Sequence, residues 1–390
     1  MYPLVLAEAG TQTCSLRFWI PAFAGMRGNK AMPPIMVVED DRFLRVVEIV
    51  LDPDAAPERA AAYADFFAHD EPDFAGWCEK IRRKAQRIYP SQVRLVATPE
   101  ALRQNLSDAG ALIVESLAVG ADELAAAPNL KAVQKFGTDL RRIDAAACAA
   151  RGVKLLTVRR RANIACAELA LTLMLMLSRR VNELNGRISA KALAALGYQY
   201  KPFDRRHTPN SNWGRVTGLN VLYGSTVGIV GLGEIGREFA ARAAAFGMRV
   251  LYTQRQEAPA AVEERYHASY RPLPELLAQS DWVALFVPSS RVTQNLIGRA
   301  ALEQMRPGAR LINISRADVV DRAALIEALR SGRLGGFALD PLYEAPGRDD
   351  DELLSFPNVI LTPHIAAQPR FNALDDLDDM ITGLARAVTP

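Results

Sequence analysis

Residues 226–247, TVGIVGLGEIGREFAARAAAFG, join a short apolar run to a glycine-rich turn and an alanine-rich helical segment. The turn carries the spacing G-x-G-x-x-G, with its glycines at Gly231, Gly233 and Gly236. In that order they permit a tight turn, let a diphosphate approach the backbone, and let the helix pack closely on the strand. Glu234 and Ile235 open the helix, whose free amides and positive dipole end attract phosphate. The segment therefore predicts a dinucleotide-binding unit.

Apolar runs alternate with helical stretches on both sides of this segment, which is typical of an α/β fold with parallel sheets. Upstream, the sequence predicts buried strands at residues 45–51, 93–98, 111–116, 130–136 and 153–158. Downstream, it predicts strands at residues 249–253, 281–288, 309–315, 336–341 and 358–364. Long apolar or amphipathic stretches favour a buried helix over residues 162–186 and a last helix over residues 372–387.

Composition restricts the class of protein. The chain has 390 residues, enough for two or three domains, and its net charge of +3 gives no argument for binding to nucleic acid or to a membrane surface. No run of eighteen apolar residues occurs, so no membrane span is expected. The four cysteines form no CxxC pair and indicate free thiols in the cytoplasm, with no metal site. Residues 1–35 show no helical or strand period, and we interpret them as a disordered leader or an over-extended start.

The strand after the glycine turn ends without an acidic residue. Its sequence is VLYTQRQ, residues 250–256, and the first acid is Glu257. An acid at this strand end usually holds the adenosine ribose hydroxyls. Without one, Thr253 can donate a hydrogen bond to a 2′-phosphate and Arg255 can add a charge-assisted contact. The sequence therefore favours NADP(H), with NAD(H) as the alternative.

A second group of polar residues follows three later strands. Arg316 follows one predicted strand, Asp340 and Glu344 follow the next, and His364 follows the last. Ligands bind beyond the carboxyl ends of strands in such sheets, so these side chains are expected to converge beside a nicotinamide. Arginine can bind a carboxylate and polarise a carbonyl group, and histidine can exchange the proton that accompanies hydride transfer.

These motifs together resemble the D-isomer-specific 2-hydroxyacid dehydrogenases. The resemblance rests on APNLKAVQKFG, NIACAELAL, TVGIVGLGEIG, INISRADVVD, GGFALD and NVILTPHIA, and it covers the chain from about residue 90 onward. It implies two Rossmann-like or flavodoxin-like α/β domains, with a cofactor domain at residues 163–366 inserted into a substrate domain at residues 36–162 plus 367–390. It also implies a homodimer joined through the cofactor domains.

The resemblance also implies roles for individual residues. Arg316 would bind the substrate carboxylate and carbonyl, and His364 would be the acid/base group. Asp340 would bind the nicotinamide carboxamide, and Pro288 would line the cofactor pocket. Backbone amides for the substrate carboxylate would come from the loop that contains Phe136, Gly137, Thr138 and Asp139.

Three positions depart from the family pattern. The family glutamate would fall at Ala345, one residue after Glu344. Either the loop slips by one residue and Glu344 serves as the partner of His364, which we favour, or His364 has no carboxylate partner. In the second case the pH optimum for reduction moves lower. Asp139 replaces a family glycine and would repel an anionic substrate unless it points away or pairs with a nearby arginine. Arg159, Arg160 and Arg161 replace a Pro-Gly turn; they are either a solvated turn, or one of them pairs with Asp139 or reaches a second acidic group on a larger substrate.

The leading hypothesis is an NAD(P)-dependent oxidoreductase that transfers a hydride between the cofactor and a 2-oxo acid/D-2-hydroxy acid pair of the glyoxylate or hydroxypyruvate kind. The alternative is a catalytically weak or inactive dinucleotide-sensing protein that acts through partners. The displaced glutamate keeps this alternative open, and the retained Arg316 and His364 argue against it. A third hypothesis, oxidation of formate or phosphite, has no positive support in the sequence.

Overall fold

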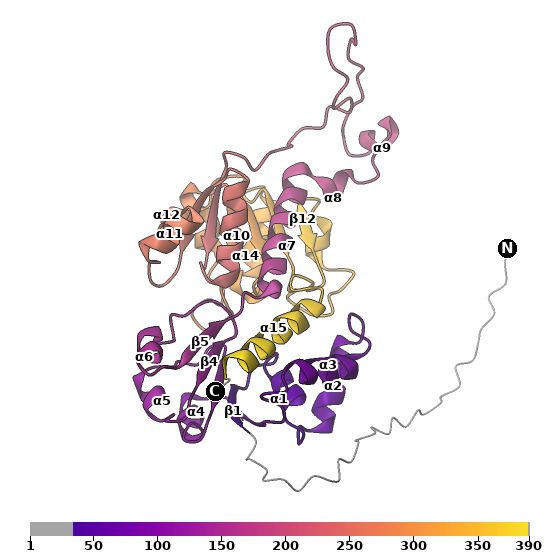
Figure 1. Cartoon of the computed structure of the whole chain (residues 1–390). Coiled ribbons are helices and arrows are strands. Elements are labelled where there is room, and N and C mark those ends of the chain that lie inside the picture. The colour runs from indigo at the N-terminus through magenta and orange to yellow at the C-terminus, as the bar shows by residue number, and fades with distance from the viewer. Residues whose placement is uncertain (1–33, 389–390) are drawn as a thin grey trace, which may run out of the picture.

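The structure, a computed structural model, describes residues 34–388. They form two α/β units, each built on one parallel sheet (Figure 1). The predicted fold class is therefore confirmed. Apart from its last two residues, the predicted leader lies outside the described residues, as does Cys14.

The first unit contains a five-stranded sheet in the order β2-β1-β3-β4-β5, the flavodoxin-like order. Its strands are β1 (Ile35–Glu39), β2 (Gln92–Val96), β3 (Ala111–Val114), β4 (Ala132–Lys135) and β5 (Lys154–Thr157). Its helices are α1 (Arg45–Leu51), α2 (Pro57–Phe67), α3 (Phe74–Lys84), α4 (Pro99–Gln104), α5 (Ala121–Ala125) and α6 (Ala145–Ala150). Helices cover both faces, so strands such as β1 and β3 are buried along their whole length.

One strand prediction is wrong. Residues 45–51, RVVEIVL, form helix α1, and the first strand is β1, ten residues earlier. Five of the seven residues of α1 are buried, because the helix packs against α2, α3, β2 and the C-terminal helix. A short run that is apolar on most sides does not distinguish a buried helix from a buried strand.

The second unit contains a seven-stranded sheet in the order β12-β11-β10-β9-β6-β7-β8. Its strands are β6 (Thr226–Val230), β7 (Arg249–Thr253), β8 (Ala268–Tyr270), β9 (Trp282–Leu285), β10 (Arg310–Asn313), β11 (Gly336–Leu339) and β12 (Val359–Leu361). Its helices include α10 (Glu234–Ala245), α11 (Ala260–Tyr266), α12 (Leu273–Gln279), α13 (Arg299–Gln304), α14 (Arg322–Arg330), and the 3-10 helices η1 (Ala317–Val319) and η2 (Glu352–Ser355). The strand order reverses between β6 and β9, which is where doubly wound sheets bind dinucleotides.

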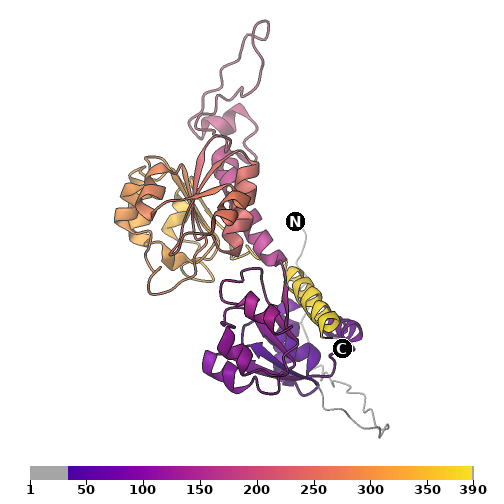
Figure 2. The same ribbon diagram turned by 60° about the vertical axis from the view of Figure 1, so that its left-hand side comes forward.

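Two helices connect the units. Helix α7 (Arg161–Arg179) packs on α10, β10, β11 and β12 of the second unit, whereas α15 (Phe371–Ala387) returns to α1, α3, β4 and β5 of the first. Figure 2 shows both helices at the junction between the units. By length and composition alone α7 could cross a membrane, but half of its apolar stretch is buried inside the fold, so its apolar character matches its place in the core.

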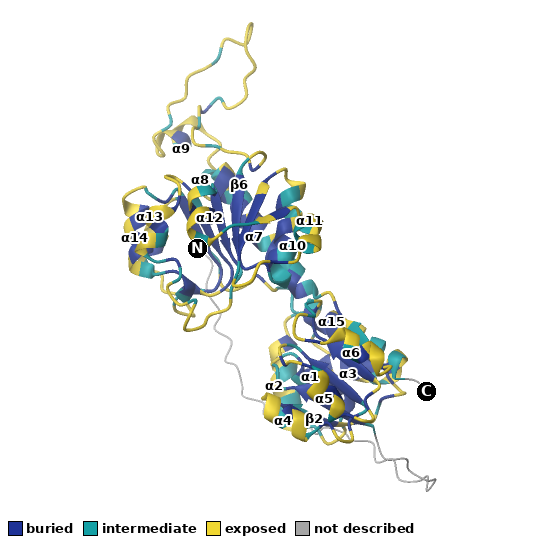
Figure 3. Ribbon diagram, turned by 90° about the vertical axis from the view of Figure 1, so that its left-hand side faces the viewer, coloured by how far each residue is buried: buried dark blue, intermediate teal, exposed yellow. Residues whose placement is uncertain are grey.

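The chain between α7 and β6 projects from the second unit as an arm, residues 185–224. It follows α8 (Val181–Leu184) and contains α9 (Ala190–Ala194). Figure 3 shows that this arm is almost entirely exposed, in contrast to the buried strands.

A buried carboxylate fixes the start of α7. Asp376 of α15 is completely buried and accepts hydrogen bonds from the backbone amide of Arg161 at 2.9 and 3.0 Å and from its Nη1 at 2.9 Å. Burial raises the pKa of Asp376, against the opposing effect of these hydrogen bonds. Asp379, one turn later on α15, pairs with Nη2 of the same arginine but is 59% exposed.

These two aspartates give a matched comparison. We expect Asp376→Ala to lower the free energy of unfolding by about 2–3 kcal/mol, because it leaves a buried amide without an acceptor. Asp379→Ala should cost less than about 1 kcal/mol, as exposed ion pairs do. The measurement is urea unfolding followed by circular dichroism, and equal losses in the two variants would contradict the assigned role of Asp376.

Candidate functional site

The glycine turn between β6 and α10 leaves room for a ligand. Gly231 has φ of +99°, and a Cβ on it would lie 2.9 Å from the carbonyl oxygen of Phe286. A Cβ on Gly236 would lie 2.2 Å from the carbonyl oxygen of Gly231. Around Gly233, in contrast, nothing lies within 4 Å of an added Cβ, so the backbone at the start of α10 is open to an approaching group.

The end of β7 lies beside this turn. The carbonyl oxygen of Thr253 accepts a hydrogen bond of 2.9 Å from the Gly231 amide, and the Thr253 side chain is buried. Arg255 is exposed and lines the same cavity as Gly233 and Glu234. The position of Arg255 is thus compatible with a contact to the nucleotide, and the roles of Thr253 and Arg255 in cofactor choice stay predictions.

Arg316, Asp340 and His364 follow β10, β11 and β12, which are neighbours in the sheet. Arg316 and His364 are exposed, and Nη1 of Arg316 donates to the carbonyl oxygen of Ser315 at 2.6 Å. Pro288 follows β9 at the same edge. The predicted residues therefore lie along one edge of the sheet, at the carboxyl ends of adjacent strands.

Asp340 holds the loop that carries His364. Its carboxylate is completely buried and accepts hydrogen bonds from the Thr362 hydroxyl at 2.7 Å and from the amides of Ile365 and Ala366 at 2.8 and 2.9 Å. The amide of His364 donates to the carbonyl oxygen of Asp340 at 3.0 Å. The structure thus gives Asp340 a positioning role, and its contact with the nicotinamide carboxamide stays a prediction.

The two candidate positions for the family glutamate are both exposed. Glu344 and Ala345 lie in the loop after β11, and Glu344 shares a surface depression with Thr362 and Pro363, next to His364 in the chain. Within residues 34–388, no hydrogen bond or ion pair joins Glu344 to His364. The sequence expectation that Glu344 serves His364 therefore has proximity but no contact to support it.

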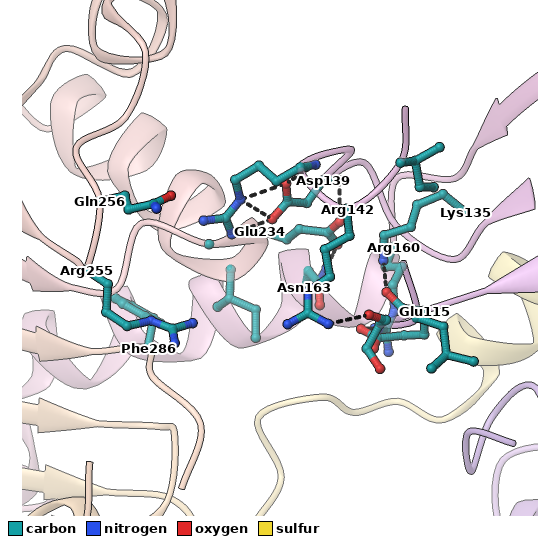
Figure 4. Close-up of a pocket in the computed structure, with 16 residues that line it drawn as sticks. Glu115, Lys135, Asp139, Arg142, Arg160, Asn163, Glu234, Arg255, Gln256 and Phe286 are labelled. Carbon is teal, nitrogen blue, oxygen red and sulfur yellow. Dashed lines mark hydrogen bonds and ion pairs between the residues drawn. The ribbon is translucent and has the colours of Figure 1, made fainter. Parts of the chain in front are cut away.

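A cavity of about 520 Å³ lies between the two units (Figure 4). Glu115, Lys135 and Arg160 stand on one side of it, and Arg255 and Phe286 on the other. Arg316 and His364 do not line this cavity. The cavity therefore joins the glycine turn to the first unit near the loop at residues 136–139 (the substrate loop), while Arg316, Asp340 and His364 (the strand-end group) are not among its lining residues.

Glu234 connects the predicted cofactor and substrate segments. Its Oε1 accepts hydrogen bonds from the amides of Thr138 and Asp139 at 2.5 and 2.8 Å, and its Oε2 accepts one from Nδ2 of Asn163 at 2.7 Å. A Cβ on Gly137, which has φ of +140°, would lie 2.3 Å from Oε1 of Glu234. The side chain of Glu234 thus contacts the substrate loop, and the predicted contact of Glu234 with the cofactor stays a prediction.

Asp139 has an arginine partner, but not one of the three predicted. Nε of Arg141 donates to its two carboxylate oxygens at 2.9 and 2.8 Å, and this pairing contributes to the lowered pKa of Asp139. Arg159 pairs with Glu238, and Arg161 pairs with Asp376 and Asp379. The suggestion that Arg159, Arg160 or Arg161 pairs with Asp139 is therefore wrong, because these side chains point to other partners.

Several functional-site residues were missed by sequence reasoning. Lys135 is buried at the end of β4, and its Nζ donates to the carbonyl oxygens of Glu115 and Phe136. Oε2 of Glu39 holds the loop beside it by accepting from the amides of Glu115, Ser116 and Leu117 at 2.7, 2.7 and 2.9 Å. A lysine and a glutamate at the ends of apolar strands were the available signals, since such residues are seldom buried without a partner.

Comparisons with known proteins agree with this geometry. A family model described as D-isomer specific 2-hydroxyacid dehydrogenase, NAD binding domain, matches residues 171–366. A glyoxylate reductase of Thermococcus gammatolerans is 35% identical over 283 residues, which cover 72% of this chain and 80% of that protein. A glyoxylate/hydroxypyruvate reductase B of Klebsiella pneumoniae is 34% identical over 315 residues, covering 78% of this chain and 92% of that protein.

A solved structure shows the same fold over almost the whole chain. The apo D-mandelate dehydrogenase of Rhodotorula graminis matches with a TM-score of 0.52 at 25% identity, covering 91% of this chain and 94% of that one. The family model spans the glycine turn and all three strand ends that carry Arg316, Asp340 and His364. The chain belongs to the D-isomer specific 2-hydroxyacid dehydrogenase family.

Proposed function

We propose that this protein reduces small 2-oxo acids of the glyoxylate and hydroxypyruvate kind to D-2-hydroxy acids, with a nicotinamide cofactor. The observation that carries the proposal is the placement of Arg316, Asp340 and His364 at three adjacent strand ends of the sheet that bears the glycine turn. The named reductases among its relatives favour this enzyme activity over the alternative of a dinucleotide-sensing protein without catalysis.

The residues beside β6 and β9, where the strand order of the second sheet reverses, fit a dinucleotide. The open space at Gly233 admits a diphosphate to the first amides of α10, which have no acceptor within the helix. When bound, the nicotinamide supplies or accepts the hydride. Gly231, Gly233, Ile235 and Gly236 would shape the phosphate site, and Pro288 would border the nicotinamide end.

The chain's own groups would bind the acid and handle the proton. Arg316 is exposed and has free guanidinium donors for the carboxylate and the adjacent carbonyl oxygen of the substrate. His364, held by the Asp340 loop, would give a proton to the oxygen during reduction and take it back during oxidation. Glu344, one residue before the family position at Ala345, is the candidate to orient the imidazole, and a loop movement would have to bring it into contact.

NADP(H) is the proposed preferred cofactor. Beyond β7 the chain presents Thr253 and the exposed Arg255, and Glu257 does not line the cavity. An arginine near the ribose 2′ position stabilises a phosphate there, whereas an acid in that place would repel it.

A cytoplasmic location is proposed from the thiols. Cys78, Cys148 and Cys166 are free and buried, and burial raises the pKa of Cys78 to about 12 and of Cys166 to about 11. Thiols of this kind are inert packing groups and suit a reducing compartment.

A homodimer joined through the arm is also proposed. The arm exposes Ile188 at 84%, Val221 at 63% and Tyr223 at 79% of their surfaces. Large apolar side chains gathered on one projecting segment indicate a protein interface. Because the arm belongs to the second unit, the interface would join cofactor domains, as the family resemblance implies.

The cofactor proposal is tested with NADPH and NADH side by side, using glyoxylate and hydroxypyruvate. NADPH should be preferred, and Arg255→Leu should raise KM for NADPH by about ten-fold or more, since a charge-assisted hydrogen bond contributes about 1.5–3 kcal/mol. KM for NADH should change little. Arg249→Leu is the matched control, because Arg249 is exposed at the opposite end of β7. A wild-type protein that prefers NADH would remove the phosphate-binding role of Arg255.

The dimer proposal is tested by light scattering coupled to gel filtration. The wild-type chain should elute with twice the chain mass, and a variant with both Ile188→Glu and Val221→Glu should elute as a monomer, because the charges cannot be buried in an apolar interface. Val292→Glu is the control, since Val292 is 79% exposed on a loop outside the arm. A dimer that survives the double change would place the interface elsewhere.

A further inference from the structure

Arg160 is unusual among the basic residues of the cavity. Its guanidinium stacks on the ring of Phe136, 4.2 Å from the ring centroid, and its side chain is only 18% exposed. Its Nε is buried without a hydrogen-bond partner in the described part of the chain. Its single ion-pair partner there is Glu115, at 4.0 Å, which is too long for a hydrogen bond. Arg160 is therefore a fixed, largely enclosed cation whose donors are poorly used.

The wall around Arg160 has an excess of positive charge. The cavity is lined by five basic residues and three acidic ones: Lys135, Arg141, Arg142, Arg160, Arg255, Glu115, Asp139 and Glu234. Two of the acids are engaged, Asp139 with Arg141 and Glu234 with backbone amides. Within the part of the chain that the structure describes, Lys135 and Arg142 donate only to backbone carbonyl oxygens, which do not neutralise their charges. Of the three acids that line the cavity, this leaves Glu115 to oppose Lys135 and Arg160.

Glu115 is a weak counterion for these cations. Burial raises its pKa, and the charges of Lys135 and Arg160 only partly offset that effect. An ionised group that arrives from solution and hydrogen-bonds Arg160 directly would be a better partner than a carboxylate 4.0 Å away.

Arg160 lies within electrostatic reach of the strand-end group. Burial raises the pKa of Cys166, on the second turn of α7, and the charges of Asp340, Arg160 and Arg316 all act on that pKa as well. Phe136, on which Arg160 stacks, opens the substrate loop. Arg316 does not line the cavity, so a substrate bound by both arginines would have to reach from the end of β10 into the cavity that Arg160 faces.

We infer that Arg160, supported by Lys135 and Arg142, forms a subsite for a second anionic group, so that the favoured substrates are 2-oxo acids with a carboxylate or phosphate at the end remote from the carbonyl. The inference rests on the proposed reductase function. The second anion replaces Glu115 as the partner of Arg160, and the planar guanidinium, held flat on Phe136, accepts it through two parallel hydrogen bonds.

The test compares pairs of 2-oxo acids that differ in the charge of the terminal group. The pairs are 2-oxobutyrate with oxaloacetate, 2-oxovalerate with 2-oxoglutarate, and hydroxypyruvate with its 3-phosphate, measured as kcat/KM with NADPH. In at least one pair, kcat/KM should be about ten-fold or more higher for the substrate with the charged terminal group than for its partner. That factor is the size of one charge-assisted hydrogen bond. The first two pairs report a carboxylate and the third a phosphate.

Two variants change the ratio in opposite directions. The ratio is kcat/KM for the substrate with the charged terminal group divided by kcat/KM for its uncharged partner. Arg160→Met should lower this ratio by about ten-fold, and Glu115→Gln should raise it, because Arg160 then has no competing carboxylate. Arg159→Met is the control: Arg159 is the neighbouring residue but is 65% exposed and bonded to Glu238, so the ratio should stay that of the wild type.

A wild-type ratio near one in all three pairs, or equal losses on both members of a pair in Arg160→Met, would overturn the subsite while leaving the reductase intact. Absence of turnover with every 2-oxo acid would instead overturn the proposed function. In that case calorimetry decides the subsite without catalysis: D-malate should bind more tightly than D-2-hydroxybutyrate to the wild type but not to Arg160→Met, and equal or absent binding would refute it.

Discussion

The bond between buried Asp376 and the start of α7 is the constraint on which the site depends. The chain passes between the units at only two places, and this carboxylate ties them together by holding the Arg161 amide to α15. Because α7 is anchored at that point, the residues around its first turn have fixed positions. Arg160 is directed to Phe136, and Asn163 is directed to Glu234. A helix that belongs by packing to the second unit thereby presents its first residues to the cavity between both units.

Carboxylates that accept backbone amides also hold three other loops of the site. Glu39 accepts three consecutive amides of the loop after β3, Asp340 accepts two amides and a hydroxyl of the loop after β12, and Glu234 accepts two amides of the loop after β4. In each case a carboxylate from one element binds the backbone of another. One carboxylate can hold several backbone groups at once, because its two oxygens offer about four lone-pair sites to donors. These acids therefore order the site loops without bonding to the side chains of Arg160, Arg316 or His364.

The sequence was sufficient for features that depend on local spacing. The glycine spacing at residues 231–236 and the polar residues after β10, β11 and β12 could be located because parallel strands end at a common edge. It failed where tertiary packing decides: residues 45–51 became a helix, and β8 was too short, at three residues, to give a period. Asp376 could not be recognised at all, since it is one of four aspartates in DDLDD, residues 375–379, and only the fold decides which of them is buried.

The three consecutive arginines at residues 159–161 contact three different parts of the structure. The backbone is extended at Arg160 and becomes helical at Arg161, so successive side chains leave the chain in different directions. Arg159 points to Glu238 on α10, Arg161 points to α15, and Arg160 is left between them, facing the cavity. The outer two bind the second unit and α15 on either side, and each is satisfied by an ion pair. Arg160 is held in place by the flanking residues and by Phe136, but none of them gives its guanidinium a hydrogen-bonded anion. A cation that is fixed in place without a good partner is what an anion-binding site requires.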